Sequence, residues 1–231
     1  MNKIKGVILD LDNTLYWYNH PNKQWHEAIL AHAEEKLGIS SKEIHDAISR
    51  AREKNHETIP THWASHSRLL YFQKALERLT GRTNFKLTLE MEELFWDTFM
   101  NHMKLYDDAM DFLEHLKKKN KKVLILTDLT AQVQKKKIIK LWIQDHVDYL
   151  VSSEEAGAEK PDPKVFELSL EKLGLKKDEV VMIGDNYEKD IMWAKRFGIN
   201  KAYHKVDEKL EADEDQDVIK FKIFSEIKED F

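Results

Sequence analysis

The segment GVILDLDNTLYWY, residues 6–18, contains the pattern that decides the fold of this protein. Its apolar run, Val7 to Leu9, has the composition of a buried strand and ends in Asp10, and a second carboxylate follows at Asp12. Residues two positions apart point to the same side of an extended chain, so the two carboxylates would lie close together. Because like charges at that separation repel, we expect a compensating positive group at the end of this strand.

Apolar segments of the same kind recur along the chain, and each ends in polar residues. The predicted buried strands are residues 5–10, 121–128, 147–153 and 179–185, with a fifth at 201–205. Helical patterns separate them at residues 108–119, 130–141, 163–173 and 188–197, and residues 217–231 suggest an edge strand and a short last helix. This alternation predicts an α/β fold with a Rossmann-like parallel sheet. Strands that are apolar on both faces indicate helices on both sides of the sheet.

One long region interrupts the alternation with helical patterns alone. Trp25, Ile29, Ala33 and Leu37 recur at helical spacing, and Gly38 follows them as a stop signal. We therefore predict a core domain formed by residues 1–16 and 104–231, with an inserted all-helical cap domain at residues 17–103.

The amino-acid composition argues against a membrane protein and against a protein that binds nucleic acid. The 231 residues are 42% hydrophobic and 34% charged, contain no cysteine, and carry a net charge of −5. No apolar run approaches the roughly 18 residues of a membrane-spanning helix, and a mildly acidic, well-mixed charge argues against binding to a nucleic acid polymer. We expect a soluble, cytoplasmic protein with neither membrane nor nucleic acid partners. The basic runs at 115–122 and 133–140 are interpreted as solvated helix surface.

Reactive side chains follow the predicted strands. In an open parallel sheet, ligands bind outside the carboxyl ends of the strands. The side chains expected there are Asp10, Asp12, Thr127, Asp128, Lys160, Asp185 and Asp190. Their convergence at one edge predicts a single site.

The charges of these residues suggest a chemistry. At roughly 4 Å and an effective dielectric constant of about 20, each pair of like charges costs on the order of 4 kcal/mol, which Lys160 alone cannot offset. A set of oxygen ligands without cysteine favours Mg²⁺. A metal, a lysine and a threonine hydroxyl suit a phosphoryl group, which a carboxylate nucleophile can accept as an acyl phosphate. A second carboxylate can protonate the leaving oxygen and then activate water.

The ordered motifs resemble those of the haloacid dehalogenase-like hydrolase superfamily. DLDNT at 10–14 is similar to its first motif, LILTD at 124–128 to its second, Lys160 in KPDPKVF to its third, and GDNYEKD at 184–190 to its fourth. The helical insertion resembles the cap of the first subclass. The segments around 130–141 and 152–167 resemble the branch that contains nucleotide and sugar-phosphate phosphatases.

The resemblance implies roles for the acidic residues. Asp10 would be the nucleophile and a Mg²⁺ ligand, and Asp12 the general acid and base, with its backbone carbonyl also binding the metal. Asp185 would bind Mg²⁺ as well. Asp190 would orient Lys160 or a metal-bound water.

The resemblance also implies a phosphate-binding set. Thr127 and Lys160 would hold the phosphoryl oxygens, with Lys160 also restraining Asp10, and Thr14 and Asn186 would support the site. Asp128 is assigned to substrate binding, although it departs from the pattern, since the family often has Asn there. A carboxylate beside a phosphate is unfavourable unless it points away or is paired.

We therefore expect a hydrolase: a Mg²⁺-dependent phosphatase that acts on a small phosphorylated metabolite, either a nucleotide or a sugar phosphate, as a monomer or homodimer. A haloacid dehalogenase of the same fold is an alternative, but it has no use for a carboxylate at Asp12. A phosphomutase is a second alternative. A non-catalytic binding protein is the third, and the intact motifs argue against it.

The aromatic residues Tyr16, Trp17 and Tyr18 are expected to wall the pocket or to stack on the substrate.

Overall fold

The sheet of the protein consists of six parallel strands in the spatial order β3-β2-β1-β4-β5-β6. The structure is a computed structural model that describes residues 4–60, 62–206 and 217–231. The strands are β1 (Gly6–Leu9), β2 (Lys122–Thr127), β3 (Tyr149–Ser152), β4 (Val180–Gly184), β5 (Ala202–Lys205) and β6 (Val218–Phe221). The predicted Rossmann-like α/β fold is therefore confirmed.

Strand β1 lies at the centre of the sheet. Its residue Leu9 pairs with Ile125 of β2 on one side and with Ile183 of β4 on the other. All four residues of β1 are buried, which agrees with a strand that is apolar on both faces. The carboxyl ends of β1, β2 and β4 thus lie side by side.

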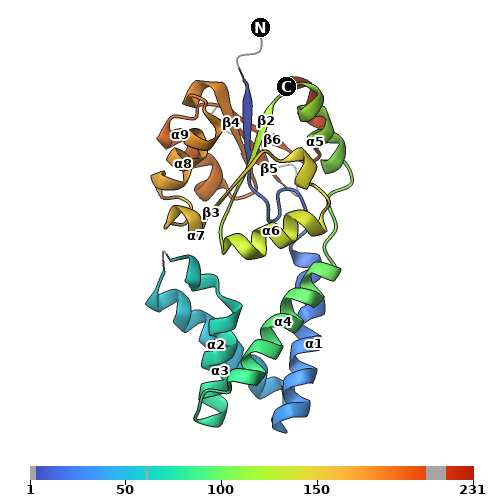
Figure 1. Cartoon of the computed structure of the whole chain (residues 1–231), viewed down its shortest axis with the longest axis vertical. Helices are drawn as coiled ribbons and strands as arrows, with labels where there is room; N and C mark the ends of the chain where they lie inside the picture. Colours follow the sequence, from blue (N-terminus) through green and yellow to red (C-terminus); the bar gives the residue numbers. More distant parts are fainter. Residues whose placement is uncertain (1–3, 61, 207–216) are drawn as a thin grey trace. The chain divides into compact units, whose positions relative to one another are not determined.

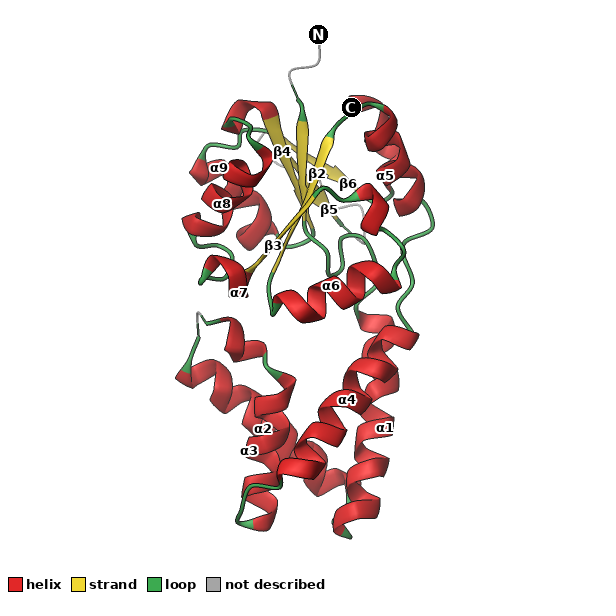
Figure 2. Cartoon of the chain, viewed as in Figure 1, coloured by secondary structure: helices red, strands yellow, loops and turns green. Residues whose placement is uncertain are grey.

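Helices cover both faces of the sheet, as Figures 1 and 2 show. One face carries α7 (Ser153–Ala156), α8 (Pro163–Leu173) and α9 (Trp193–Phe197), and the other carries α5 (Ala109–Lys118) and α6 (Ala131–Lys140). The α8 side of the core is formed by apolar residues that include Ile8, Leu126, Phe166, Met182 and Ile191.

The opposite face of the sheet has an aromatic core. Phe112 of α5 stacks on Phe224 at a centroid distance of 4.8 Å, and Phe231 packs against both Phe112 and Tyr203. These rings tie the last residues of the chain to α5 and β5. Burial of large aromatic side chains supplies much of the packing of this layer.

The chain divides into two compact units: Met1–Trp17 with Lys104–Phe231, and Tyr18–Met103. The second unit consists of α1 (Asn19–Leu37), α2 (Ser41–Thr58), α3 (Arg68–Thr80) and α4 (Phe85–Asn101), with a 3₁₀ turn at Trp63–His66. Helix α1 ends as its sequence predicts, because Gly38 adopts a left-handed φ of 65° and its N–H donates to Glu34 O. The described residues contain no strand in this unit.

The structure differs from the predicted elements in two places. The helix expected at 188–197 begins as a π-helix, Tyr187–Met192, before α9. The short last helix is replaced by two 3₁₀ turns, Phe224–Glu226 and Lys228–Asp230.

None of the helices in the described ranges combines the length and the apolarity that a bilayer crossing requires.

Candidate active site

Lys160 lies at the centre of the site, between two carboxylates. Its Nζ donates to Asp10 Oδ1 at 2.6 Å and to Asp190 Oδ1 at 2.7 Å, and all three side chains are buried. Burial alone would lower the pKa of Lys160, but the charges of Asp10, Asp190 and Asp128 raise it well above its usual value. Lys160 is therefore a permanent cation at the carboxyl end of β1, where the sequence requires one.

The backbone of Asp10, directly after β1, makes one further hydrogen bond to β4. Its N–H donates to Ile183 O at 2.9 Å, so the carboxylate is fixed directly after the strand. Thr14 Oγ1 donates to Asp10 Oδ2 at 2.8 Å and lies 3.5 Å from Asp185 Oδ1. Asn13, with φ 62°, turns the chain so that Thr14 returns to Asp10.

Three carboxylates form a cluster that fits a divalent cation. Asp10, Asp185 and Asp190 each offer an oxygen, and these oxygens lie within 4.8 Å of one another. Hard oxygen donors at this spacing suit Mg²⁺. Asp190 already accepts from Lys160 Nζ through Oδ1 and from Asn186 N through Oδ2. Asp10 and Asp185 are therefore the better ligands, and Asp190 orients Lys160.

The cluster is electrostatically strained without a cation. Burial and the neighbouring charge of Asp190 raise the pKa of Asp185 to about 6. Burial also raises the pKa of Asp10 well above its usual value, against the opposing effect of Lys160. Lys160 lowers both pKa values, but it does not fully offset burial together with the neighbouring carboxylates.

Asp12 has a separate cationic partner, Lys137 of α6. The Lys137 Nζ donates to Oδ1 at 2.7 Å and to Oδ2 at 2.9 Å, and Tyr16 OH donates to Oδ1. The Asp12 side chain is 27% exposed, whereas that of Lys137 is fully buried. Burial acts to raise the pKa of Asp12, but Lys137 and Tyr16 outweigh it, so that pKa lies below its usual value.

The buried Lys137 corrects the interpretation of the basic run at 133–140 as solvated surface. Lys135 and Lys136 are exposed, as expected, but Lys137 is not. It lies four residues after the buried Val133 and four before the buried Leu141, which is the spacing of one helix face. That periodicity is the sequence signal that identifies it.

Thr127 and Asp128 lie at the end of β2. Thr127 is buried, and its Oγ1 accepts from Gln134 Nε2 at 2.9 Å. Gln134 Nε2 also donates to the backbone carbonyl of Asp128. Gln134, a second residue of α6 absent from the predicted site, thus fixes the turn after β2.

The carboxylate of Asp128 is paired, which accounts for its departure from the family pattern. Its Oδ1 accepts from the backbone N–H of Lys160 at 3.1 Å, and its Oδ2 lies 3.6 Å from Lys189 Nζ. The side chain therefore holds the loop that carries Lys160.

Asn186 and Gly184 shape the end of β4. Asn186 Oδ1 accepts from Lys189 N at 2.9 Å and begins the π-helix, whose wide turn contains Asp190. Asp190 lies directly against Gly184, where a Cβ would collide with its carboxylate. Glycine at 184 therefore permits the position of Asp190 beside Lys160.

The aromatic residues after the first motif have three different environments. Tyr16 is fully buried beside Asp12, and Trp17 is 56% exposed and packs near Tyr106. Tyr18 belongs to the helical unit, where its hydroxyl accepts from Arg68. Of these three residues, Tyr16 is hydrogen-bonded to a predicted catalytic residue, Asp12.

Comparison with known proteins agrees with this geometry. A sequence model of the haloacid dehalogenase-like hydrolases matches residues 4–198. A ribulose-1,5-bisphosphate 5-phosphatase of Halopiger xanaduensis is 37% identical over 92% of this chain and 89% of its own length. A glyceraldehyde 3-phosphate phosphatase of Methanopyrus kandleri is 32% identical over 85% of this chain and 82% of its own.

The fold is shared with solved structures. The crystal structure of a HAD phosphatase from Thermococcus onnurineus superimposes with a TM-score of 0.78 at 23% identity, covering 98% of this chain and 97% of that one. The motifs at the ends of β1, β2 and β4, the family match and the relatives agree: this chain belongs to the haloacid dehalogenase-like hydrolases.

Proposed function

We propose that this protein is a Mg²⁺-dependent phosphatase that hydrolyses small phosphate esters through a phosphorylated Asp10. The observation that supports this most directly is the position of Asp10. It follows the central strand, its two oxygens accept from Lys160 and Thr14, and a second carboxylate stands two residues on. The phosphatase names of the relatives favour this reaction over dehalogenation.

The reaction would proceed in two displacements. A carboxylate oxygen of Asp10 attacks phosphorus, the bond from phosphorus to the ester oxygen breaks, and Asp12 gives that oxygen a proton. Asp12 then takes a proton from a water molecule. The water oxygen attacks the phosphoryl group, which releases inorganic phosphate and restores Asp10.

The contact with Lys137 determines the protonation state of Asp12 before substrate binds. The ammonium group holds Asp12 ionised in the free protein. A phosphate dianion beside Asp12 raises its pKa and so favours the protonated form that the first displacement needs. Lys137 therefore acts as a positioning residue for the proton-transfer group.

Charge compensation would come from the remaining residues. Lys160 and Thr127 bind the phosphoryl oxygens, and Asp190 orients Lys160. Asp10, Asp185 and the backbone carbonyl of Asp12 would hold a Mg²⁺ ion, which would supply positive charge against the phosphoryl oxygens.

We assign catalysis to the α/β unit and substrate selection to the helical unit. The two relatives above are named for a pentulose bisphosphate and a triose phosphate, which favours a sugar phosphate over a nucleotide. The absence of cysteine and the mixed charge agree with a cytoplasmic enzyme of small metabolites, without nucleic acid or membrane partners.

The direct test is the Asp10→Asn variant. Turnover of p-nitrophenyl phosphate with Mg²⁺ should fall by roughly 10³-fold or more, because the amide is a poor nucleophile. Circular dichroism should show an unchanged fold. Turnover at the wild-type rate in this variant would reject the proposal.

Parallel assays separate the alternatives. Chloride release from 2-chloropropionate by the wild-type protein would indicate a dehalogenase. Phosphoryl transfer to an added sugar, in place of phosphate release, would indicate a mutase.

A further inference from the structure

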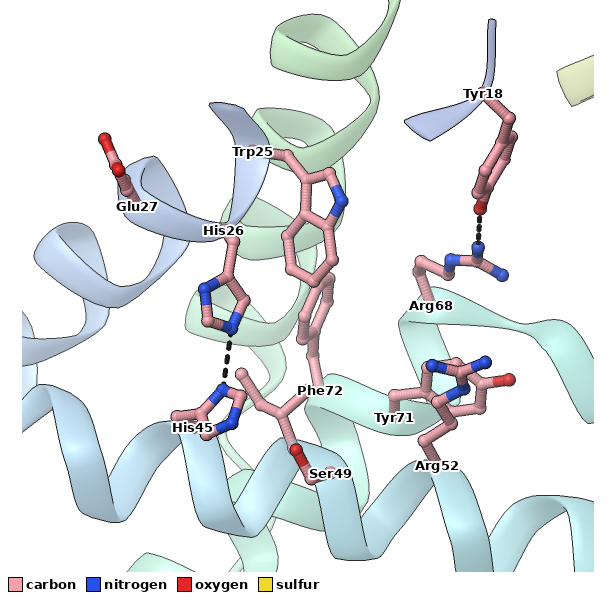
Figure 3. Close-up of a pocket in the computed structure, with 11 residues that line it drawn as sticks. Tyr18, Trp25, His26, Glu27, His45, Ser49, Arg52, Arg68, Tyr71 and Phe72 are labelled. Atoms are coloured by element: carbon pink, nitrogen blue, oxygen red, sulfur yellow. Dashed lines mark hydrogen bonds between the residues drawn. The ribbon is translucent and has the colours of Figure 1, made fainter. Parts of the chain in front are cut away.

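The helical unit contains a cavity of about 480 Å³ that the proposed chemistry does not use. Its lining residues come from the segment before α1 and from α1, α2 and α3 (Figure 3). Trp25, Ile48 and Phe72 supply apolar and aromatic walls. A pocket of this volume suits a small molecule.

Two arginines bring positive charge to the cavity. Arg52 of α2 and Arg68 of α3 both line it, and in Figure 3 their guanidinium groups lie on the same side of the pocket. Among the residues that the structure describes, neither has a carboxylate within ion-pair distance. The acidic residue of the lining is Glu27, which is exposed and lies at the opposite side in this view.

Arg68 is held in place before any ligand arrives. Its guanidinium donates to His66 O at 2.6 Å and to Tyr18 OH, and it lies 5.3 Å from the ring centroid of Phe95. Aromatic contact and fixed hydrogen bonds reduce the conformational entropy that binding would cost. The group is thus an ordered, half-buried cation without an acidic partner.

Polar groups occupy another part of the wall. His26 Nε2 lies 2.7 Å from His45 Nδ1, and the two rings meet edge to face. One ring must donate to the other, so at least one is neutral in this contact. The His26–His45 pair can hydrogen-bond to a hydroxyl group of a ligand. It carries no negative charge that would neutralise Arg52 or Arg68.

We propose that this cavity binds a small organic phosphate, with Arg52 and Arg68 on the phosphate oxygens and the aromatic wall against the carbon skeleton. Guanidinium groups match the geometry of phosphate oxygens and stay charged. The ligand is either a phosphorylated metabolite that the protein also hydrolyses or a separate effector. The first case rests on the proposed function, whereas the second does not.

Calorimetric titration of the full-length Asp10→Asn protein with Mg²⁺ tests the site without turnover. The probes are glycerol 3-phosphate, ribose 5-phosphate and fructose 1,6-bisphosphate. Adding Arg52→Gln should raise the Kd of at least one probe about tenfold or more, because a charge-assisted contact is lost. Arg50→Gln is the matched control: Arg50 is also exposed on α2 but does not line the cavity.

The outcomes distinguish the possibilities. Equal Kd values in the Arg50→Gln, Arg52→Gln and Arg52→Gln/Arg68→Gln proteins, or no binding of any probe, would overturn the inference. If the wild-type protein hydrolyses the arginine-dependent probe, the ligand is substrate. If the probe changes p-nitrophenyl phosphate turnover without being hydrolysed, it is an effector.

The proposed phosphatase function and the proposed phosphate-binding cavity can be rejected independently of each other. Full turnover in Asp10→Asn would reject the proposed function, while arginine-dependent binding would still establish the cavity as a phosphate site.

Discussion

The side chain of Lys137 is buried because it has a fixed partner. An unpaired ammonium group inside a protein is strongly unfavourable, whereas contact with both oxygens of Asp12 compensates its charge. Tyr16 completes the arrangement from the other side of the carboxylate. Asp12, the proposed proton-transfer group, is thus oriented by two residues that the motif pattern does not include.

Replacing Lys137 should therefore impair catalysis. In Lys137→Met we expect kcat for p-nitrophenyl phosphate to fall about 10²-fold, since a misplaced Asp12 loses much of its general acid and base effect. KM should change less, because the phosphate-binding residues remain. Steady-state kinetics on Lys136→Met, an exposed neighbour on the same helix, should match the wild type. A kcat for Lys137→Met equal to that control would contradict the assigned role.

The carboxylate of Asp128 also acts through a neighbour. Its Oδ1 accepts the backbone N–H of Lys160, and the amide oxygen of Asn can do the same. We expect Asp128→Asn to keep kcat/KM within about twofold, whereas Asp128→Ala should lose about fivefold, since one partly buried hydrogen bond is worth about 1 kcal/mol. Equal loss in both variants would show that the charge, and not the hydrogen bond, matters.

Two secondary-structure elements, helix α6 and the π-helix at Tyr187–Met192, position side chains of the site. Helix α6 presents Gln134 and Lys137 on one face, so a single turn contacts both the end of β2 and Asp12. The π-helix at Tyr187–Met192 places Asp190 against Gly184. Single π turns are frequent at functional sites, and here the turn supplies a partner for Lys160.

A methyl group at residue 184 tests the packing of the π-helix. Gly184→Ala would push the Asp190 carboxylate away from its place beside Lys160. We expect turnover of p-nitrophenyl phosphate to fall at least tenfold, because a shift of about 1 Å in a catalytic group costs up to 10²-fold. The control change Gly174→Ala is made at a glycine with open space around it but a left-handed φ of 63°. An alanine there strains the backbone, so this variant tests whether a loss of stability alone lowers activity. Full activity in Gly184→Ala would contradict the packing argument.

The sequence predicted the parts of the site that depend on strand ends. Asp10 and Thr127 follow apolar runs, so their convergence is a consequence of parallel pairing. The spacing of Lys137 from Val133 and Leu141 places it on the buried helix face, but the sequence does not identify its partner, Asp12, which is 125 residues away. The cavity of the helical unit could not be predicted, since it depends on how three helices pack. The π-helix was missed because its repeat leaves no distinct pattern in so short a segment.

At the scale of the whole molecule, the carboxylate cluster would link folding to the binding of the proposed Mg²⁺. Burial raises the pKa of both Asp10 and Asp185, and the neighbouring carboxylates raise it further. Their protonated forms are favoured by the metal-free fold, so their contribution to stability is present below pH 4. It is lost as pH rises through the value of about 6 for Asp185.

Magnesium should reverse this loss. In EDTA, we expect Tm to decline between pH 5 and pH 7.5. A Mg²⁺ concentration about 100 times its Kd should raise Tm at pH 7.5 by on the order of 5 °C. The rise should be smaller at pH 5, where protons compete for the ligands. Asp185→Asn should show a weaker response to Mg²⁺, as measured by differential scanning calorimetry, and a Tm indifferent to Mg²⁺ at both pH values would refute the metal assignment.

The central position of β1 should protect the backbone next to Asp10 from local unfolding. Its amides are hydrogen-bonded within a buried ladder between β2 and β4, so hydrogen exchange there requires opening of the sheet on both flanks. Strand β6 stands at the sheet edge and does not pair with β1. We therefore expect the amides of β1, which precede Asp10, to exchange more slowly than those of β6.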